Sequence, residues 1–394
     1  MRHPCLILSF FCGLFLLAPG CHLDTTGLPA NHLNNVNNAA GPDVDIADAG
    51  PDADADAGHD PIVVTSETRT YPVPASPANP VTGETAPPET QFIRVVRYFA
   101  ENPWHPTRAI VLAYPGAQLG AGSYRTLAET LIDHSGGALE VWAYERRGNL
   151  LEDRTGIDAA VSAEDVDLAF AYYGAGVELD GRTFAGVIAG DAPTFMSEWG
   201  LAQEVRDLKM VLDFIPEDRR RSNVILLGFS LGSPFVGQFA AWDFDGTKAS
   251  DQLAGVIMLD GGGKRRSLSE ADYHGEGCVG SLGLRIGLDD LRAHGPYVQE
   301  LGLDSGIWIA LELAALRASG NFSDPHAEIT DEVLRNLIGI FLDKPGLRLT
   351  ARAAMAMLID DQFAPALVMR AGLGMIATGP GWHYSTAARS RSTP

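Results

Sequence analysis

One serine stands at the junction of an apolar strand pattern and a helix pattern. The pentapeptide GFSLG at 228–232 follows the apolar run 223–227 and opens a helical pattern over 231–244. Glycines on both sides of Ser230 permit a sharp turn that leaves the serine hydroxyl at its tip. The free N–H groups of a helix N-terminus converge there, so the Leu231 N–H is placed to stabilise a developing oxyanion. This spacing predicts a nucleophilic serine.

The flanking sequence supplies the elements that such a turn requires. Strands are predicted where short apolar or alternating runs end at turn residues, and helices where apolar residues recur every three or four positions. Strands separated by helices favour an α/β fold with a mostly parallel sheet and helices on both faces. The predicted strands are 62–71, 92–99, 109–114, 139–144, 223–227 and 255–259, and the predicted helices are 123–134, 201–215 and 231–244.

Two more turns lie where predicted strands end. The first reads Tyr-Pro-Gly-Ala at 114–117, and the second reads Tyr-Glu-Arg-Arg-Gly at 144–148. Together with the elbow at 228–232 they occur in an order that resembles the α/β-hydrolase superfamily, over about residues 90 to 375. The resemblance implies an α/β-hydrolase-type sheet and acyl transfer to water, with no metal and no organic cofactor. It also implies that the backbone at Gly116 and Ala117 completes the oxyanion hole.

A serine of this kind needs a base and an acid to orient the base. The resemblance implies the chain order serine, acid, histidine. Asp260 follows the predicted strand 255–259 and is a candidate acid, although an aspartate in that place also commonly caps a loop. His383 is the candidate base, and a histidine in a loose tail is the alternative. The chain leaves little length for further strands, so we expect it to be cut short relative to the superfamily, with an exposed sheet edge, low stability and little hydrolysis.

The pattern changes after Asp260. Apolar residues at helical spacing over 307–316, 333–342 and 347–359 predict a helical cap inserted after the last strand. A plain helical layer on the sheet is the alternative. The boundaries expected are an α/β-hydrolase core over 62–263, a helical cap over 264–375 and a disordered or truncated tail over 376–394.

The N-terminus predicts export. Residues 1–21 hold a short apolar run that ends at Cys21, which resembles a bacterial lipoprotein signal with a lipid-modified cysteine. Ordinary secretion is the alternative. Residues 22–61 contain eight aspartates and neither lysine nor arginine, a composition typical of a disordered acidic tether. The expected location is therefore the bacterial cell envelope, through a lipid anchor, or the medium.

Composition narrows the function classes. Fifty acidic residues outnumber 29 lysines and arginines, and a net charge of -21 argues against nucleic-acid binding. The sequence holds no glycine-rich phosphate motif and no metal-binding motif, so we expect no cofactor. The function predicted is a serine hydrolase that cleaves a small ester or amide through an acyl-enzyme on Ser230. A surface lipoprotein that keeps the scaffold without catalysis, and an acyltransferase, are the alternatives.

Overall fold

The computed structural model describes most of the predicted core and short pieces of the chain after residue 261. Expectations for the signal peptide, Cys21 and all but the last residues of the tether fall outside the described residues, as do most of those for the cap. The described residues are 59–116, 119–151, 153–185, 193–261, 270–271, 274, 287–295, 313, 328, 348–350, 353, 375–377 and 383–384.

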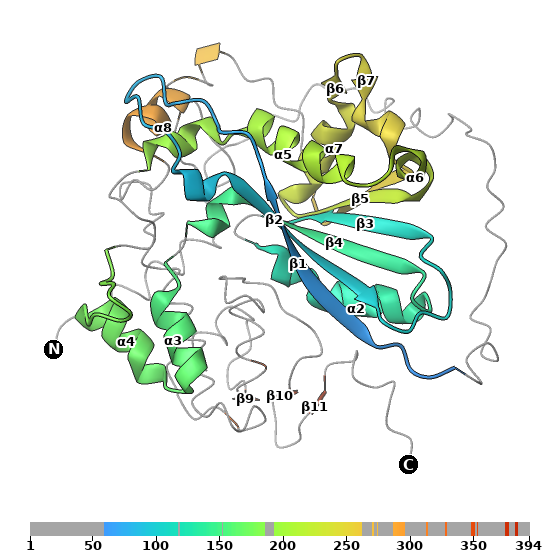
Figure 1. The fold of residues 1–394 in the computed structure, drawn as a ribbon, viewed down its shortest axis with the longest axis horizontal. Helices are drawn as coiled ribbons and strands as arrows, with labels where there is room; N and C mark the ends of the chain where they lie inside the picture. The colour runs from blue at the N-terminus through green and yellow to red at the C-terminus, as the bar shows by residue number, and fades with distance from the viewer. Residues whose placement is uncertain are drawn as a thin grey trace, which may run out of the picture.

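The core is a six-stranded sheet in the order β1-β2-β4-β3-β5-β8 (Figure 1). β2 pairs antiparallel with β1 and with β4, whereas β4, β3, β5 and β8 are parallel to one another. Every predicted strand is present, which confirms the mostly parallel α/β fold. The strands are β1 (Val64–Pro72), β2 (Phe92–Ala100), β3 (Ala109–Tyr114), β4 (Leu139–Glu145), β5 (Val224–Phe229) and β8 (Gly255–Leu259).

Helices cover both faces of this sheet, as the sequence predicts. The helix α2 (Arg125–His134) lies on one face, and α5 (Leu201–Asp213) and α7 (Gly232–Ala241) lie on the other (Figure 1). Alternate residues of β3 enter different cores: Leu112 packs with α5 and α7, whereas Val111 packs with α2. A strand buried on both faces must be apolar at nearly every position, which explains the continuous apolar runs in the sequence.

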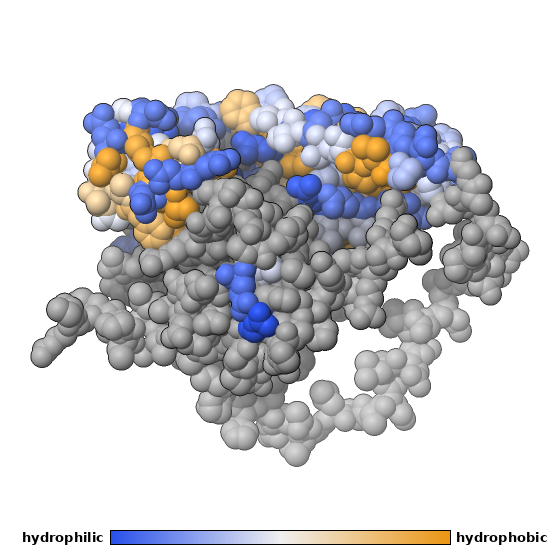
Figure 2. All heavy atoms as spheres, turned by 90° about the horizontal axis from the view of Figure 1, so that it is seen from below, coloured by the Kyte–Doolittle hydropathy of each residue, from blue (hydrophilic) through white to orange (hydrophobic). Residues whose placement is uncertain are grey.

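The segment between β4 and α5 holds a helical hairpin. It consists of α3 (Thr155–Ala163) and α4 (Val166–Ala175), which pack through Ile157, Ala160 and Ala169. Apolar residues gather at this end of the molecule in the view from below (Figure 2). The remaining short elements before residue 261 are η1 (Pro88–Thr90), η2 (Ala121–Tyr124), η3 (Arg147–Leu150), η4 (Thr194–Glu198), α6 (Glu217–Asn223), β6 (Asp243–Phe244), β7 (Thr247–Lys248) and η5 (Ala249–Gln252).

The part after residue 261 differs from the expected all-helical cap. Beside the helix α8 (Leu288–His294), it contains a small antiparallel sheet of β9 (Arg348–Leu349), β10 (Met375–Ala377) and β11 (His383–Tyr384). Thus β9 lies inside the predicted helix 347–359, and β10 and β11 lie at or beyond the expected end of the cap. Strands of two or three residues are too short to show an alternating pattern, so the sequence did not reveal them.

β8 forms one edge of the described central sheet. Among the described residues its ladder partner is β5 alone. Four consecutive apolar side chains of β8, Val256 to Leu259, are between 36% and 50% exposed. An apolar edge strand of this kind presents unpaired backbone groups beside apolar side chains. Within the part of the chain that is described, no helix is long and apolar enough to cross a lipid bilayer.

Candidate active site

Ser230 occupies a strained turn between β5 and α7. Its φ angle is 51°, in the left-handed region that residues with a side chain seldom adopt. Neighbouring groups hold this conformation: the Ser230 N–H donates to the Leu259 carbonyl at 2.9 Å, and the Ser233 hydroxyl donates to the Gly228 and Leu259 carbonyls at 2.9 and 2.8 Å. Backbone strain that the surroundings enforce in this way is concentrated at functional sites.

The two glycines of the turn are required by close backbone approach. A Cβ atom on Gly228 would overlap the carbonyl oxygen of Gly232 and lie 2.8 Å from a methyl carbon of Val236. A Cβ atom on Gly232 would lie 2.6 Å from the carbonyl oxygen of Tyr114, at the end of β3. The spacing of glycines around Ser230 therefore follows from how tightly α7 folds back onto β5 and β3.

The expected oxyanion-hole residues lie around this turn as far as the structure describes them. A Cβ atom on Gly116 would sit 3.2 Å from the Cβ atom of Ser230, so the loop after β3 packs directly against the serine. Leu231 immediately precedes α7, and its side chain is 56% exposed. Ala117 lies outside the described residues. The structure thus brings two of the three predicted residues beside Ser230.

Substitution of Gly228 tests the tightness of the turn. We expect Gly228→Ala to destabilise the fold by about 3 kcal/mol, because overpacking a well-packed site typically costs 1–3 kcal/mol and here the added carbon meets backbone. Gly174→Ala is the matched control, because Gly174 lies in α4 with no atom within 4 Å of an added Cβ. The control should gain about 0.5–1 kcal/mol of helix stability. Urea unfolding of both variants measures this, and equal stabilities would contradict the close approach.

A pocket opens beside the turn. Its volume is about 340 Å³, and the residues that line it come from the end of β3, the turn after β4, the start of α5 and the start of α7. Its walls are mostly apolar or aromatic, and its charged groups are one carboxyl and one guanidinium. The lining residues that matter for its chemistry are Tyr114, Arg146, Trp199, Glu204, Leu231 and Phe235.

Glu204, in the first turn of α5, is the carboxyl of this pocket. Its Oε2 atom accepts hydrogen bonds from the Tyr114 hydroxyl at 2.9 Å and the Tyr144 hydroxyl at 3.4 Å. Burial raises the pKa of Glu204 above its ordinary value, and the nearby charge of Asp207 adds to that shift, whereas Arg146 and the Tyr114 hydrogen bond oppose it. Burial and the Glu204 charge likewise raise the pKa of Tyr114 well above 10. Sequence reasoning did not single out Glu204, because its neighbours in space are remote in sequence.

The raised pKa of Glu204 predicts a pH-dependent stability. The group is more readily protonated folded than unfolded, so its favourable contribution is complete below the unfolded pKa and is lost as pH rises through the folded pKa. The neighbouring groups act in both directions. Arg146, Arg147 and the Tyr114 hydroxyl favour the ionised carboxylate, whereas the Asp207 charge disfavours it, and the Tyr144 hydroxyl lies close by. As the pH rises above the pKa of an ordinary glutamate, we expect the free energy of unfolding of Glu204→Gln to increase progressively relative to that of the parent protein. Urea midpoints across pH measure this, and a pH-independent difference would contradict it.

A buried ion pair connects the turn after β4 to α5, two segments that contribute to the pocket wall. Arg147, the first residue of η3, donates to both carboxylate oxygens of Asp207 on α5, at 2.5 and 2.7 Å, and each side chain is 1% exposed. Arg147 also donates to the Pro74 carbonyl at 3.1 Å, and Gln203 donates to Asp207 at 2.9 Å. Asp207 lies three residues after Glu204, so this pair sets the position of the first turns of α5.

The neighbouring Arg146 ties the second turn to the loop after β3. Its Nη2 atom donates to the carbonyl oxygens of Pro115 and Gly116, and its guanidinium lies over the Tyr114 ring, 5.4 Å from the centroid. The Tyr114 ring stacks in turn on Phe235 of α7 at 3.8 Å. Arg146 therefore connects the Gly116 backbone to the wall of the pocket.

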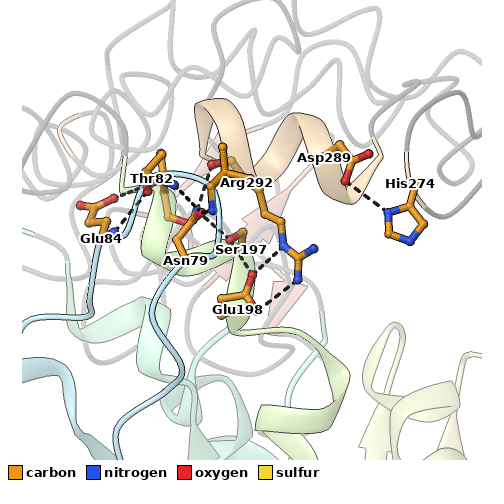
Figure 3. Close-up of polar contacts among 10 residues, drawn as sticks. Asn79, Thr82, Glu84, Ser197, Glu198, His274, Asp289 and Arg292 are labelled. Atoms are coloured by element: carbon orange, nitrogen blue, oxygen red, sulfur yellow. Dashed lines mark hydrogen bonds and ion pairs between the residues drawn. The ribbon is translucent and has the colours of Figure 1, made fainter.

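A polar cluster joins α8 to the core near the pocket (Figure 3). The buried amide of Asn79 donates to the carbonyls of Thr194 and Arg292 at 2.8 and 2.9 Å and to the Ser197 hydroxyl at 3.2 Å. Arg292 of α8 pairs with Glu198 at 2.8 Å. Since Glu198 ends η4 and is followed by Trp199, this cluster fixes the chain that forms one wall of the pocket.

The described residues do not test whether the predicted acid and base meet at Ser230. Asp260 directly follows β8 with a φ of 47°, next to the turn but with an exposed side chain. His383 lies in β11, in the small separate sheet. Among the side chains that the structure describes, which leave out that of His383, no histidine or carboxylate forms a hydrogen bond with the Ser230 hydroxyl. The arrangement of these three residues as a triad stays a prediction.

A histidine other than His383 has an acid partner in the described part of the chain. The Nδ1 atom of His274 lies 3.2 Å from Asp289 Oδ1, and both side chains are partly exposed (Figure 3). A carboxylate on one ring nitrogen orients an imidazole and selects its tautomer. No sequence pattern marks this pair, because fifteen positions separate the two residues. In the part of the chain that the structure describes, no group of three or more His, Cys, Asp or Glu residues is placed to hold a metal ion.

Similarity to known proteins is found in structure and not in sequence. No family model matches the chain, and no curated protein matches it in sequence. Solved structures that are similar to it include a peroxisomal α/β-hydrolase from Saccharomyces cerevisiae, with 10% identity, 54% of this chain and 49% of that chain covered, and a TM-score of 0.30. A cold-adapted esterase from an Arctic intertidal metagenomic library shares 14% identity, with 50% and 58% covered and a TM-score of 0.25.

A third similar structure is the S-formylglutathione hydrolase of Staphylococcus aureus, with 10% identity, 65% of this chain and 74% of that chain covered, and a TM-score of 0.29. The chain spans about half of the yeast hydrolase and less than two thirds of the Arctic esterase. The strand order, the parallel crossovers and the turn at Ser230 match an α/β-hydrolase-type fold. A fold of this type hosts many functions, so the function has to be argued from the site.

Proposed function

We propose that the protein is a serine hydrolase that cleaves a small ester or amide, with Ser230 as the nucleophile. The observation that carries the proposal is the geometry of the turn. A serine is held at a φ of 51° between two glycines that have no room for a side chain, and the Gly116 backbone packs against it. Such a turn stores strain and exposes a hydroxyl at the N-terminus of α7, which a structural turn does not need.

The reaction follows from these positions. The Ser230 hydroxyl attacks the acyl carbon while a histidine accepts its proton, and the tetrahedral oxyanion is held by N–H groups at Leu231 and at Gly116 or Ala117. Collapse expels the alcohol or amine, which takes the proton from the histidine, and leaves an acyl-enzyme on Ser230. Water then attacks the acyl group with the same histidine as base, and the acid product leaves.

The histidine has two candidates. His383 with Asp260 follows from the chain order of the superfamily, and His274 follows from its hydrogen bond to Asp289. Labelling with a fluorophosphonate probe, together with ester turnover, tests the proposal on the full chain. We expect the parent protein to be labelled. Of the two variants His274→Gln and His383→Gln, the one that replaces the catalytic base should lose labelling and the other should keep it. Absence of labelling in the folded parent would contradict hydrolysis.

A second candidate function is a binding protein that keeps the hydrolase scaffold without catalysis. One observation favours it: among the side chains that the structure describes, which leave out that of His383, no histidine forms a hydrogen bond with the Ser230 hydroxyl. The same probe separates the two functions, because a fluorophosphonate reacts with an activated serine and not with an idle one. An acyltransferase would label as a hydrolase does, and would be recognised by faster turnover when an alcohol is added.

We also propose that the protein is exported and anchored by a lipid on Cys21, with the acidic segment 22–61 as its tether. Support comes from the short apolar run before Cys21 and from the excess of aspartate after it. We expect mass spectrometry of protein from bacterial membranes to show cleavage before Cys21 and an acylated N-terminal residue. Cys21→Ala should move the protein out of the membrane fraction. An intact first segment, or an unmodified Cys21, would contradict the anchor.

A further inference from the structure

We propose that the pocket beside Ser230 takes the acyl chain of the substrate, and that Glu204 selects chains that carry a hydroxyl group. The inference rests on the proposed hydrolase function and adds the substrate class. It identifies Glu204 as a specificity residue that bonds the chain and takes no part in the reaction at the acyl carbon.

The position of the pocket makes it a site for part of the substrate. Leu231, whose N–H is the proposed oxyanion donor, lines the pocket, and so do Pro234 and Phe235 from the first turn of α7. Arg146 also lines the pocket, and it donates to the Gly116 carbonyl. An acyl group attached to Ser230 is therefore one residue from the pocket wall at Leu231, and Arg146 connects the same pocket to the Gly116 backbone.

The walls suit an alkyl chain. Half of the ten lining residues are apolar or aromatic without a charged or hydroxyl group: Trp199, Leu201, Leu231, Pro234 and Phe235. A pocket of about 340 Å³ is at the small end of the range for ligand sites, which is roughly 300–1,000 Å³. A short chain is therefore expected. The charged groups of the pocket, Glu204 and Arg146, would select the chemical group at the end of the chain that is remote from the ester.

Glu204 has one carboxyl oxygen that could accept a hydrogen bond from the remote end of the acyl chain. Its Oε2 atom already receives the hydroxyls of Tyr114 and Tyr144. Its Oε1 atom receives no hydrogen bond from any residue in the described ranges, although the carboxyl lines the pocket. Glu204 is only partly buried, so in the empty pocket this oxygen is reached by water, and a bound donor would replace that water with a direct hydrogen bond.

Two observations favour a neutral hydroxyl over an ammonium group. The Arg146 guanidinium lines the same pocket and repels a second cation. Burial also raises the pKa of Glu204, so the site favours the protonated carboxyl more than water does. A hydroxyl bonds either form, because it donates to a carboxylate and accepts from a carboxylic acid. An ammonium group can only donate.

The experiment compares p-nitrophenyl esters of hexanoic, ω-hydroxyhexanoic and ω-aminohexanoic acids. We expect the parent to hydrolyse the hydroxy ester about tenfold faster in kcat/KM than the plain ester, the effect of one added hydrogen bond. The amino ester should be the poorest of the three. Glu204→Leu should reverse the preference between the first two, and Glu204→Gln should retain much of it. Glu129→Leu, on the exposed face of α2, is the matched control and should leave the ratios unchanged.

A binding measurement separates failure of this inference from failure of the proposed function. In the Ser230→Ala variant, calorimetry should show ω-hydroxyhexanamide binding about tenfold more tightly than hexanamide, again the effect of one added hydrogen bond. If the parent hydrolyses no ester but this binding preference is present, the pocket assignment stands and the hydrolase assignment falls. Two results would overturn the inference: equal hydrolysis of the plain and hydroxy esters by the parent protein, or equal binding of the two amides by Ser230→Ala. Neither result depends on whether Glu204→Leu folds.

Discussion

Ser230→Ala should abolish labelling by a fluorophosphonate probe and lower ester turnover by at least about 10³-fold. The expected loss is large because the serine forms the covalent intermediate, and no other hydroxyl can replace it at the tip of the turn. The fold should survive, since the Ser230 contacts that hold the turn are made by its backbone N–H and carbonyl groups. Labelling, turnover and urea unfolding of the same preparation measure all three.

Ser222→Ala is the matched control for this prediction. Ser222 is exposed near the end of α6 and bonds only to the adjacent Asn223 among the described residues. We expect parent levels of labelling and turnover in this variant. Full activity in Ser230→Ala would remove the nucleophile assignment, whereas loss of folding in that variant would leave the labelling of the His274 and His383 variants as the remaining test of an activated serine.

Arg147→Ala should lower the free energy of unfolding by about 3–5 kcal/mol, the largest stability effect expected in this protein. Arg147 and Asp207 are each 1% exposed, so removal of the cation leaves a buried carboxylate without its partner. The effect should extend to the site, because Asp207 lies one turn after Glu204 on α5. Urea unfolding measures the stability, and the preference among the p-nitrophenyl esters measures the displacement of Glu204.

Two further variants separate burial from charge in this prediction. Arg125→Ala removes an arginine from an exposed pair with Glu129 on α2 and should cost about 0.3–0.5 kcal/mol. The double change Arg147→Met with Asp207→Leu removes both buried charges and should restore much of the stability lost in the single variant. A cost below about 1 kcal/mol for Arg147→Ala would contradict the pairing, since exposed pairs already reach that value.

The sequence determined the local elements of this protein. Strands β3 and β5 were predictable because a parallel strand buried on both faces is apolar throughout, and such a run is visible without knowing its neighbours. The same apolar run marked β8, although that strand is an exposed edge among the described residues. The turn at Ser230 was predictable for a similar reason, because its glycines, strand and helix lie within about twenty consecutive residues. The short strands β9 to β11 were not, because two or three residues carry no periodic signal.

Only the tertiary structure decided which distant residues meet at the site. Gly116 reaches Ser230 because β3 and β5 are adjacent in the sheet, and Tyr114 reaches Glu204, 90 positions away, because α5 packs on the face of that sheet. Arg147 meets Asp207 across 60 positions. Such contacts depend on the order in which the strands cross over, and each residue alone has the appearance of an ordinary surface charge or core aromatic. The turn was therefore visible in the sequence, whereas the pocket and the charged groups that define its selectivity required the fold.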